Sequence, residues 1–230
     1  MPNQPDSLLI LAAGFGTRMG PLTEKEPKPL VSLLGKPLID HTLDLVHDAG
    51  ITTIAANLHY QFEKLEKYLT PKGVAVSVEL PDILETGGGL RQALPLLGNG
   101  PVFTLNPDAV WKGPNPLALL RAAWDPDKMD ALLLTLPQEN ALGYTGKGDF
   151  LMDAEGRLAR GPGNVYSGAQ IVKTQALHSI PDTVFSLNKL WDILMDRGRA
   201  YGLIYPGQWC DVGTPKGLKQ AEDMLGAARV

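Results

Sequence analysis

The sequence has very little of the chemistry that thiols and imidazoles provide. Its only cysteine is Cys210, so intramolecular disulfides and cysteine-rich zinc sites are excluded. Because no histidine lies near Cys210 in the sequence, we interpret this cysteine as a small buried residue rather than a nucleophile. The histidines show no HxxxH or HxH spacing, and we interpret them as surface or helix residues: His41, His47, His59 and His178.

The sequence also lacks long apolar runs and clusters of basic residues. Residues 1–7 carry no lysine or arginine, and the apolar run from Leu8 to Gly14 is too short for a secretion signal or a membrane span. No lysine- or arginine-rich run offers a footprint for a phosphate backbone, and the net charge is −4. We therefore expect a cytoplasmic protein with neither a membrane nor a nucleic acid as its partner.

A hydrophobic fraction of 44% over 230 residues is ample for one large packed domain. In the first part of the chain, short apolar runs alternate with helical patterns. The expected strands cover residues 8–13, 30–34, 52–58, 74–80, 101–106 and 131–137. The expected helices cover residues 37–50, 61–69, 87–97 and 116–124. This alternation predicts an α/β fold whose mostly parallel central sheet carries helices on both faces.

After about residue 140 the pattern changes to shorter strands around glycine turns. Residues 143–160 and 164–172 predict antiparallel strands, followed by a helix at 186–198, a strand and loop at 202–213 and a closing helix at 215–228. With no linker or repeat in the sequence, we expect this half to add a substrate-binding lobe to the same sheet. Ligands of open sheets bind beyond the carboxyl ends of the strands, where the motifs below fall.

The stretch LAAGFGTRMGPLTEKEPKPL places glycines directly after the first expected strand. Bare backbone N–H groups at such a position can approach an anion. A Walker A loop is excluded, because GxxxxGK[ST] is absent. In the dinucleotide pattern GxGxxG, Gly14 and Gly16 would fit, but Met19 holds the place of the third glycine and a Gly-Pro pair interrupts the helix. A NAD-dependent dehydrogenase is therefore disfavoured.

An ordinary glycine turn would explain Gly14 and Gly16, but not the two cations in the same loop. Arg18 offers a planar fork for phosphate oxygens. Lys28 lies between two prolines, which restrict the backbone and direct its ammonium group. Two cations suit nucleotidyl transfer, because negative charge builds on the leaving pyrophosphate. We therefore interpret this stretch as a loop that wraps a nucleoside triphosphate.

This stretch resembles the signature LAAGxGTRxxPLTxxxPKPL of sugar-1-phosphate nucleotidyltransferases. The resemblance continues through ETGGGLRQALPLL, LNPDAVW and GQWCDVGTP, and it covers essentially the whole chain. The segments ETGGG, GKGDF, YSGAQIV and WCDVGTP are most similar to the N-acetylmuramate-1-phosphate uridylyltransferase branch. Mannose-1-phosphate guanylyltransferases are near relatives and remain an alternative.

The resemblance implies a Rossmann-like, GT-A-like nucleotidyltransferase fold with a mixed central sheet. The single domain would span residues 1–230, with a nucleotide-binding part at about 1–135 and a sugar-binding part at about 136–230. The implied partners are a nucleoside triphosphate, UTP by branch, and a sugar 1-phosphate, N-acetylmuramate 1-phosphate by branch. The products would be the nucleotide sugar and pyrophosphate. We expect a monomer or a small homo-oligomer.

The resemblance also implies a role for each matching residue. Arg18 would stabilise the leaving pyrophosphate, and Lys28 would hold the phosphate near the reacting centre. Asp108 and Asp211 would hold Mg²⁺, which prefers a few carboxylates together with phosphates and waters. The nucleotide-binding residues would be Leu11, Ala12, Ala13, Gly14, Gly16, Thr17, Glu85, Thr86, Gly87, Gly88 and Asn106. The sugar-binding residues would be Lys147, Gly148, Asp149, Tyr166, Ser167 and Gly168.

Two departures from the family pattern leave a second hypothesis open, a non-catalytic sugar-nucleotide sensor on the same fold. Pro107 stands where the family usually has a small residue, and the EKP motif is absent, so that Lys147 would have to replace its charge. Simpler interpretations are strand-end caps for Asp108 and Asp211, close packing at a helix entry for residues 85–89, and an exposed loop lysine. We interpret the tryptophans as core or rim residues: Trp111, Trp124, Trp191 and Trp209.

Overall fold

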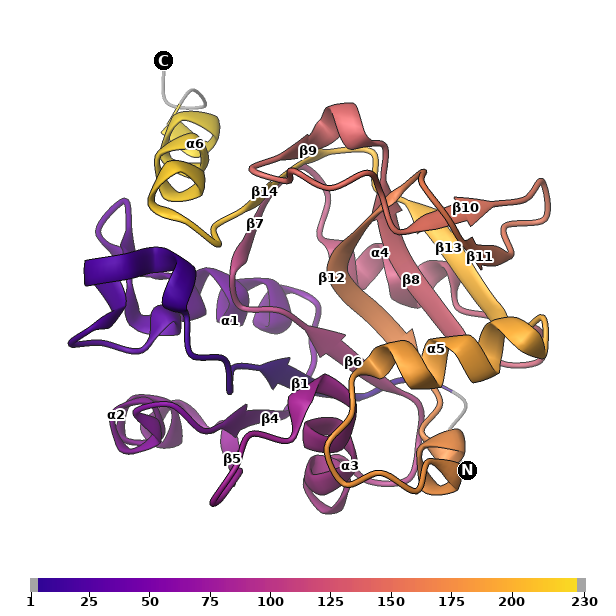
Figure 1. The fold of residues 1–230 in the computed structure, drawn as a ribbon, viewed down its shortest axis with the longest axis horizontal. Helices are drawn as coiled ribbons and strands as arrows, with labels where there is room; N and C mark the ends of the chain where they lie inside the picture. The colour runs from indigo at the N-terminus through magenta and orange to yellow at the C-terminus, as the bar shows by residue number, and fades with distance from the viewer. Residues whose placement is uncertain (1–3, 227–230) are drawn as a thin grey trace.

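The computed structural model describes residues 4–226, and a seven-stranded sheet forms its centre (Figure 1). The strand order is β13-β8-β12-β6-β1-β4-β5. In chain order these strands are β1 (Ser7–Leu11), β4 (Thr53–Leu58), β5 (Ala75–Val78), β6 (Val102–Leu105), β8 (Ala131–Leu136), β12 (Val165–Val172) and β13 (Ala200–Ile204). Only β12 runs antiparallel to its neighbours in this sheet. The predicted mostly parallel, mixed sheet is therefore confirmed.

Helices cover both faces of this sheet, as the sequence pattern predicts. They are α1 (Leu38–Asp48), α2 (Phe62–Leu69), α3 (Glu85–Leu97), α4 (Pro116–Ala123) and α5 (Leu187–Asp196), whereas α6 (Pro215–Gly226) packs outside this sheet. Successive side chains of a strand point to opposite faces of the sheet. On β1, Leu8 and Ile10 accordingly pack in the core that includes α1, α2 and α4, whereas Leu9 packs in the core that includes α3 and α5.

Three smaller sheets extend this framework. β7 (Ala109–Lys112), β14 (Gln208–Asp211) and β9 (Ala141–Leu142) form one, β10 (Phe150–Met152) pairs with β11 (Leu158–Arg160), and β2 (Ser32–Leu33) pairs with β3 (Lys36–Pro37). The antiparallel pairing expected within residues 143–160 is present as β10 and β11. The strand and loop expected at 202–213 are instead the end of β13 and the separate strand β14.

The expected five-residue strand at 30–34 is wrong in extent. Only the two residues of β2 are extended, and they form a hairpin outside the central sheet. Leu34 and Gly35 have φ values of 53° and 81°, so the chain turns before a longer strand can form. At the C-terminus, α6 begins at the expected proline, and the expected helix residues 227 and 228 lie outside the described residues.

A third, smaller core lies under α6 and joins segments that are far apart in the sequence. Met19 belongs to residues 11–30, which we call the glycine loop. It packs there with Val110 of β7, with Val212 just after β14 and with Ala221 of α6. Met19, Val110 and Val212 lie one or two residues after the predicted site residues Arg18, Asp108 and Asp211. The core therefore fixes the ends of β7 and β14 against the glycine loop. No helix within residues 4–226 is long and apolar enough to cross a membrane.

Candidate active site

Hydrogen bonds that link β1, β4 and the residue after β5 fix the point at which the glycine loop leaves the sheet. The Ala12 N–H, just past β1, donates to Asn57 Oδ1 at 3.0 Å. Asn57 lies in β4 and donates through Nδ2 to Glu79 Oε1 at 2.7 Å, and Glu79 follows β5. Glu79 is fully buried, so the hydrogen bond replaces contact with water at this oxygen. The loop therefore leaves the sheet at a defined place.

Gly16 and Gly14 serve the loop in different ways. Gly16 has φ 66°, in the left-handed region, and a Cβ placed there would lie 2.9 Å from Lys28 Cβ. Its carbonyl accepts hydrogen bonds from the Met19 N–H at 2.9 Å and from Thr23 Oγ1 at 3.0 Å. A Cβ at Gly14, by contrast, would meet nothing within 4 Å. Gly16 is thus needed by the fold, whereas Gly14 leaves room beside the backbone.

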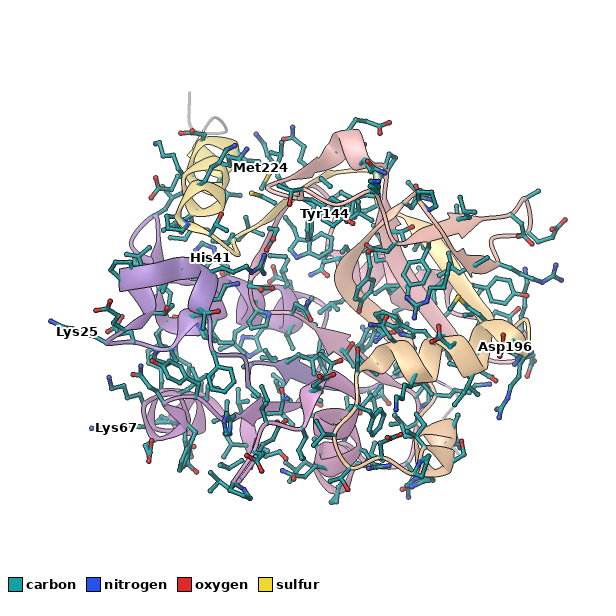
Figure 2. The ribbon with its side chains drawn as sticks, viewed as in Figure 1. Lys25, His41, Lys67, Tyr144, Asp196 and Met224 are labelled. Carbon is teal, nitrogen blue, oxygen red and sulfur yellow. The ribbon has the colours of Figure 1, made fainter. Side chains whose placement is uncertain are left out.

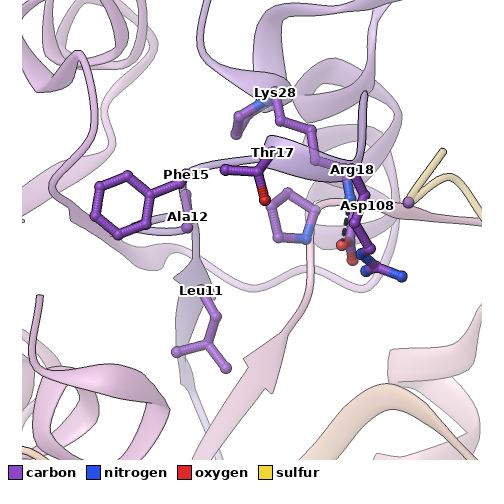
Figure 3. A pocket seen from close by; sticks show the side chains of 12 residues that line it. Leu11, Ala12, Phe15, Thr17, Arg18, Lys28 and Asp108 are labelled. Atoms are coloured by element: carbon purple, nitrogen blue, oxygen red, sulfur yellow. Dashed lines mark hydrogen bonds and ion pairs between the residues drawn. The ribbon is translucent and has the colours of Figure 1, made fainter. Parts of the chain in front are cut away.

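Lys28 is held where the sequence interpretation places a fixed cation. The residue is only 8% exposed, and its Nζ lies 2.6 Å from Asp108 Oδ2, an ion pair drawn as a dashed line in Figure 3. Pro27 is extended, with φ −64° and ψ 144°, and Pro29 stands in the first turn of the short 3₁₀ helix Lys28–Leu30. Asp108 follows β6, directly after Pro107. Pro107 therefore does not turn the Asp108 carboxylate away from Lys28.

Arg18 and Asp211 form a looser pair beside this one. Arg18 Nη1 lies 3.8 Å from Asp211 Oδ2, and the Arg18 side chain is 65% exposed. Burial raises the pKa of Asp211 most, and the negative charge of Asp108 raises it further, while Lys28 and Arg18 act in the opposite direction. The two carboxylates and two cations therefore share one electrostatic environment at the ends of β6 and β14.

Two cavities adjoin this charged group. The first, of about 270 Å³, is drawn in Figure 3 and is lined by Leu11, Ala12, Gly14, Phe15, Gly16, Thr17, Arg18, Lys28, Pro29, Pro107, Asp108 and Gly213. The second, of about 310 Å³, is lined by Arg18, Asn106, Asp108, Gly143, Tyr144, Thr145, Gly146, Tyr166, Ser167, Gly168, Trp209 and Asp211. Because Arg18 and Asp108 line both, they stand at the junction. The arrangement can hold one phosphate-bearing ligand on each side of shared charges.

The predicted sugar residues of β12 form a wall of the second cavity. The Asn106 N–H donates to the Gly168 carbonyl at 2.9 Å. Gly168 has φ 85°, and a Cβ there would lie 2.9 Å from Asn106 Cβ, so the close approach requires glycine. The Ser167 hydroxyl donates to the Leu134 carbonyl at 2.6 Å. Asn106, Ser167 and Gly168 are thus built tightly into this wall, and what they bind stays a prediction.

The predicted residues 147–149 do not line the second cavity, but Gly148 and Asp149 contact residues that do. Asp149 Oδ2 accepts the Tyr166 N–H at 2.8 Å, and Asp149 Oδ1 accepts the Tyr144 hydroxyl at 3.4 Å. Gly148 has φ 87°, with no room for a Cβ beside the Gly163 carbonyl. Tyr144 lies near the centre of the view in Figure 2 and lines the cavity. Gly148 and Asp149 thus hold the loop, while the exposed Lys147 follows a cavity-lining glycine.

The predicted glycines at the start of α3 have a packing reason in the structure. The N–H groups of Gly87 and Gly88 donate to the Phe185 carbonyl at 2.9 and 3.0 Å. A Cβ at Gly87 would lie 2.4 Å from Phe185 Cε2. Thr86 Oγ1 accepts the Leu187 N–H at 2.9 Å. None of residues 85–88 is among those that line the two cavities, and their contact with a nucleotide stays a prediction.

Four residues that line the first cavity were not predicted as site residues. Phe15 stands between the two glycines and is 45% exposed, and a lone aromatic residue in that loop was the available signal. Gly213 lies so close to the guanidinium that a Cβ would be 2.8 Å from Arg18 Nη2, and its place two residues after Asp211 was a signal. Pro29 and Pro107 were considered only for their effects on the neighbouring Lys28 and Asp108. The predicted Ala13 is buried but does not line the cavity.

The two carboxylates at the junction fit a divalent cation. Burial raises the pKa of Asp211 most and the negative charge of Asp108 raises it further, and a cation beside both carboxylates would offset this cost. Within residues 4–226, no three His, Cys, Asp or Glu side chains gather as a metal site. Two carboxylates suit Mg²⁺, which usually takes its other ligands from phosphates and waters. Cys210 is buried, and burial raises the pKa of its thiol to about 12, which disfavours a nucleophile.

Residues 8–161 match the family described as MobA-like NTP transferase domain. The chain is 39% identical to the N-acetylmuramate alpha-1-phosphate uridylyltransferase of Caulobacter vibrioides, over 99% of this chain and 100% of that protein. It is 36% identical to the enzyme of the same name from Neisseria meningitidis, over 95% of this chain and 98% of that one.

A solved structure supports the fold at lower sequence identity. HddC from Yersinia pseudotuberculosis, complexed with GMP-PN, is similar with a TM-score of 0.77 and covers 95% of this chain and 99% of its own. Its sequence is 20% identical to this chain, so the likeness concerns the fold alone.

Proposed function

This chain belongs to the MobA-like NTP transferase family, and from that premise we propose that it transfers a uridylyl group from UTP to N-acetylmuramate 1-phosphate. The choice of UTP and of this sugar rests on the names of the two relatives that match almost its whole length. The observation that carries nucleotidyl transfer is the junction itself, where Arg18, Lys28, Asp108 and Asp211 meet between two cavities.

In the proposed reaction, an oxygen of the sugar phosphate attacks the α-phosphorus of UTP. The new bond joins that oxygen to the α-phosphorus, the bond from the α-phosphorus to the bridging oxygen breaks, and pyrophosphate leaves with the electron pair. The sugar phosphate is already ionised, so the step needs no general base. The chain's task is to align two anions and to stabilise charge on the leaving group, which positioned cations do effectively.

Arg18 and Lys28 divide this task in our proposal. Arg18 is exposed and only loosely paired, so it is free to turn toward the leaving pyrophosphate. Lys28 is buried and held by Asp108, so it presents a fixed charge to the phosphate near the reacting centre. Asp108 and Asp211 would hold Mg²⁺, which when bound screens the repulsion between the two substrates' phosphates.

We propose that the first cavity takes the nucleotide and the second takes the sugar phosphate. The predicted loop residues from Leu11 to Thr17 line the first cavity, with the exception of Ala13. The wall of Tyr166, Ser167 and Gly168 lines the second. Lys147 would contact the sugar 1-phosphate from the rim, in place of the absent EKP lysine.

A screen of pyrophosphate release tests this function directly. UTP, GTP, dTTP and CTP would each be combined with a panel of sugar 1-phosphates that includes N-acetylmuramate, N-acetylglucosamine and mannose 1-phosphates. We expect UTP with N-acetylmuramate 1-phosphate to turn over fastest. Faster turnover of GTP with mannose 1-phosphate would favour a guanylyltransferase instead. Binding of a nucleotide sugar without pyrophosphate release from any pair would favour the sensor.

A further inference from the structure

Phe15 is an unusual residue for the place it occupies. The residue is 45% exposed, and it lies between Gly14 and Gly16 in the loop that carries Arg18. A large apolar side chain that stays in contact with water does not gain the stabilisation that burial would give it. Such exposure at a cavity wall is a feature of binding surfaces.

The ring is also held in one place before any ligand is considered. It meets the His59 ring edge-on, with centroids 5.4 Å apart and planes at 87°, and the Tyr60 ring lies 5.8 Å away. His59 Nδ1 is hydrogen-bonded to the Glu79 carbonyl at 2.9 Å, and Tyr60 donates to the Thr23 carbonyl at 3.2 Å. Because both neighbours are anchored, Phe15 forms a preorganised aromatic wall.

The first cavity is therefore charged at one end and apolar at the other. In Figure 3, Arg18 and Asp108 lie on one side of Thr17, and Phe15 lies on the other side. Lys28 reaches Asp108 and belongs to the charged end. A nucleoside triphosphate has the same polarity, with its phosphates at one end and a planar base at the other.

We propose that Phe15 is the platform on which the base of the bound nucleoside triphosphate stacks. The proposal rests on the proposed function, which places the phosphates at Arg18 and Lys28 and so directs the base to the apolar end. Every nucleobase has a π-face, so stacking is tolerant of base identity. Phe15 accordingly strengthens binding of UTP and of GTP alike, and it does not select uracil.

The test compares ligands with and without a base. The dissociation constants of UTP, GTP and inorganic tripolyphosphate would be measured by calorimetry on the wild type, Phe15→Ala and Phe15→Tyr. Phe15→Ala should weaken both nucleotides about tenfold, within the range measured for loss of one stacking partner, and should leave tripolyphosphate unchanged. Phe15→Tyr keeps the ring and should bind like the wild type. Leu34→Ala, at an exposed residue that does not line this cavity, is the matched control.

Two results would overturn the proposal. Unchanged nucleotide binding in Phe15→Ala would mean that the ring does not touch the base. Equal weakening of nucleotides and of tripolyphosphate would mean that Phe15 only shapes the loop. If the wild type releases pyrophosphate from UTP while either result holds, the platform fails and the proposed function stands. If the wild type binds no nucleoside triphosphate at all, both fail together.

Discussion

At the scale of single residues, the two cations of the glycine loop differ in how much of the fold depends on them. Lys28 is buried and neutralises Asp108, whereas the guanidinium of Arg18 stands mostly in solvent. A buried charge that loses its partner is costly, while an exposed pair contributes little to stability. The stability of the fold therefore depends more on Lys28 than on Arg18, although both have a proposed role in the reaction.

We expect Arg18→Ala and Lys28→Ala each to lower kcat/KM with UTP. A charge-assisted contact that tightens in the transition state is typically worth ~2–4 kcal/mol. Arg18→Ala should leave the unfolding temperature unchanged, and Lys28→Ala should lower it, because Asp108 is left unpaired. Steady-state kinetics and thermal unfolding check both, with Arg197→Ala as an exposed arginine control. Wild-type kinetics in both variants would remove the central role of this loop.

That the charged residues of the candidate site lie together could be predicted from the sequence, because its motifs place cations and carboxylates close to strand ends. Lys28, Asp108 and Asp211 come from three distant segments and meet as the motifs imply. The position of Phe15 in the cavity wall could not be predicted from these motifs. Its exposure depends on His59 and Tyr60, which follow another strand and carry no motif.

At the scale of elements, the entry into α3 shows why a glycine run is ambiguous in sequence. Gly89 packs against the hydrogen-bonded pair Asn57 and Glu79, and Gly87 packs against Phe185. Asn57 lies in β4, Glu79 follows β5 and Phe185 lies far along the chain, so no local sequence pattern indicates these partners. Close packing and ligand contact both call for glycine, and only the three-dimensional neighbours distinguish them.

A pair of glycine substitutions separates the two roles. A Cβ at Gly89 would lie 2.4 Å from Glu79 Oε1, so Gly89→Ala should lower the free energy of unfolding by roughly 1–3 kcal/mol, as overpacking does. Gly14 has open space around it, so Gly14→Ala should keep the stability and weaken UTP binding. Chemical denaturation and calorimetry measure the two effects. Equal stability of both variants would contradict the packing account.

At the scale of the whole molecule, charges at the far edge of the sheet hold strands together without belonging to the site. Asp130, just before β8, receives hydrogen bonds from Lys173 at 2.9 Å and from Arg199 at 3.0 Å. Partial burial alone would raise the pKa of Asp130, but the two cations outweigh it and leave that pKa below its usual value. This clamp ties the start of β8 to the end of β12 and the start of β13.

The lowered pKa of Asp130 predicts how stability changes with acidity, and its control must be an exposed aspartate without an ion pair. The unfolded chain binds a proton near pH 3.9, and the folded chain only at lower pH. The clamp is therefore fully present above that value and is lost as the pH falls through the folded pKa. Thermal unfolding between pH 6 and pH 3 should show a steeper loss for the wild type than for Asp130→Asn. The exposed Asp82→Asn is the control, and parallel curves for wild type and Asp130→Asn would contradict this account.

The architecture could be predicted at this scale because alternating apolar runs and amphipathic helices leave few ways to bury both faces of a sheet. The antiparallel strand expected at 164–172 is present as β12, but its place between β6 and β8 and the small core under α6 were not predicted. Both depend on pairings between segments that are distant in sequence, such as Met19 with Val212 and Ala221. Local periodicity contains no information on such partners.

Mg²⁺-dependent pyrophosphate release from UTP and N-acetylmuramate 1-phosphate tests the central claim, that the carboxylates and cations at the junction carry out the transfer. It would be measured in the wild type, Asp108→Asn, Asp211→Asn and the double variant, with the exposed Asp153→Asn as control and direct Mn²⁺ binding as a second readout. Each single variant should lose on the order of 10²-fold or more in rate and should bind Mn²⁺ more weakly. The double variant should be scarcely worse, because residues that act as a unit are not additive. Mild losses in all three variants would contradict the account.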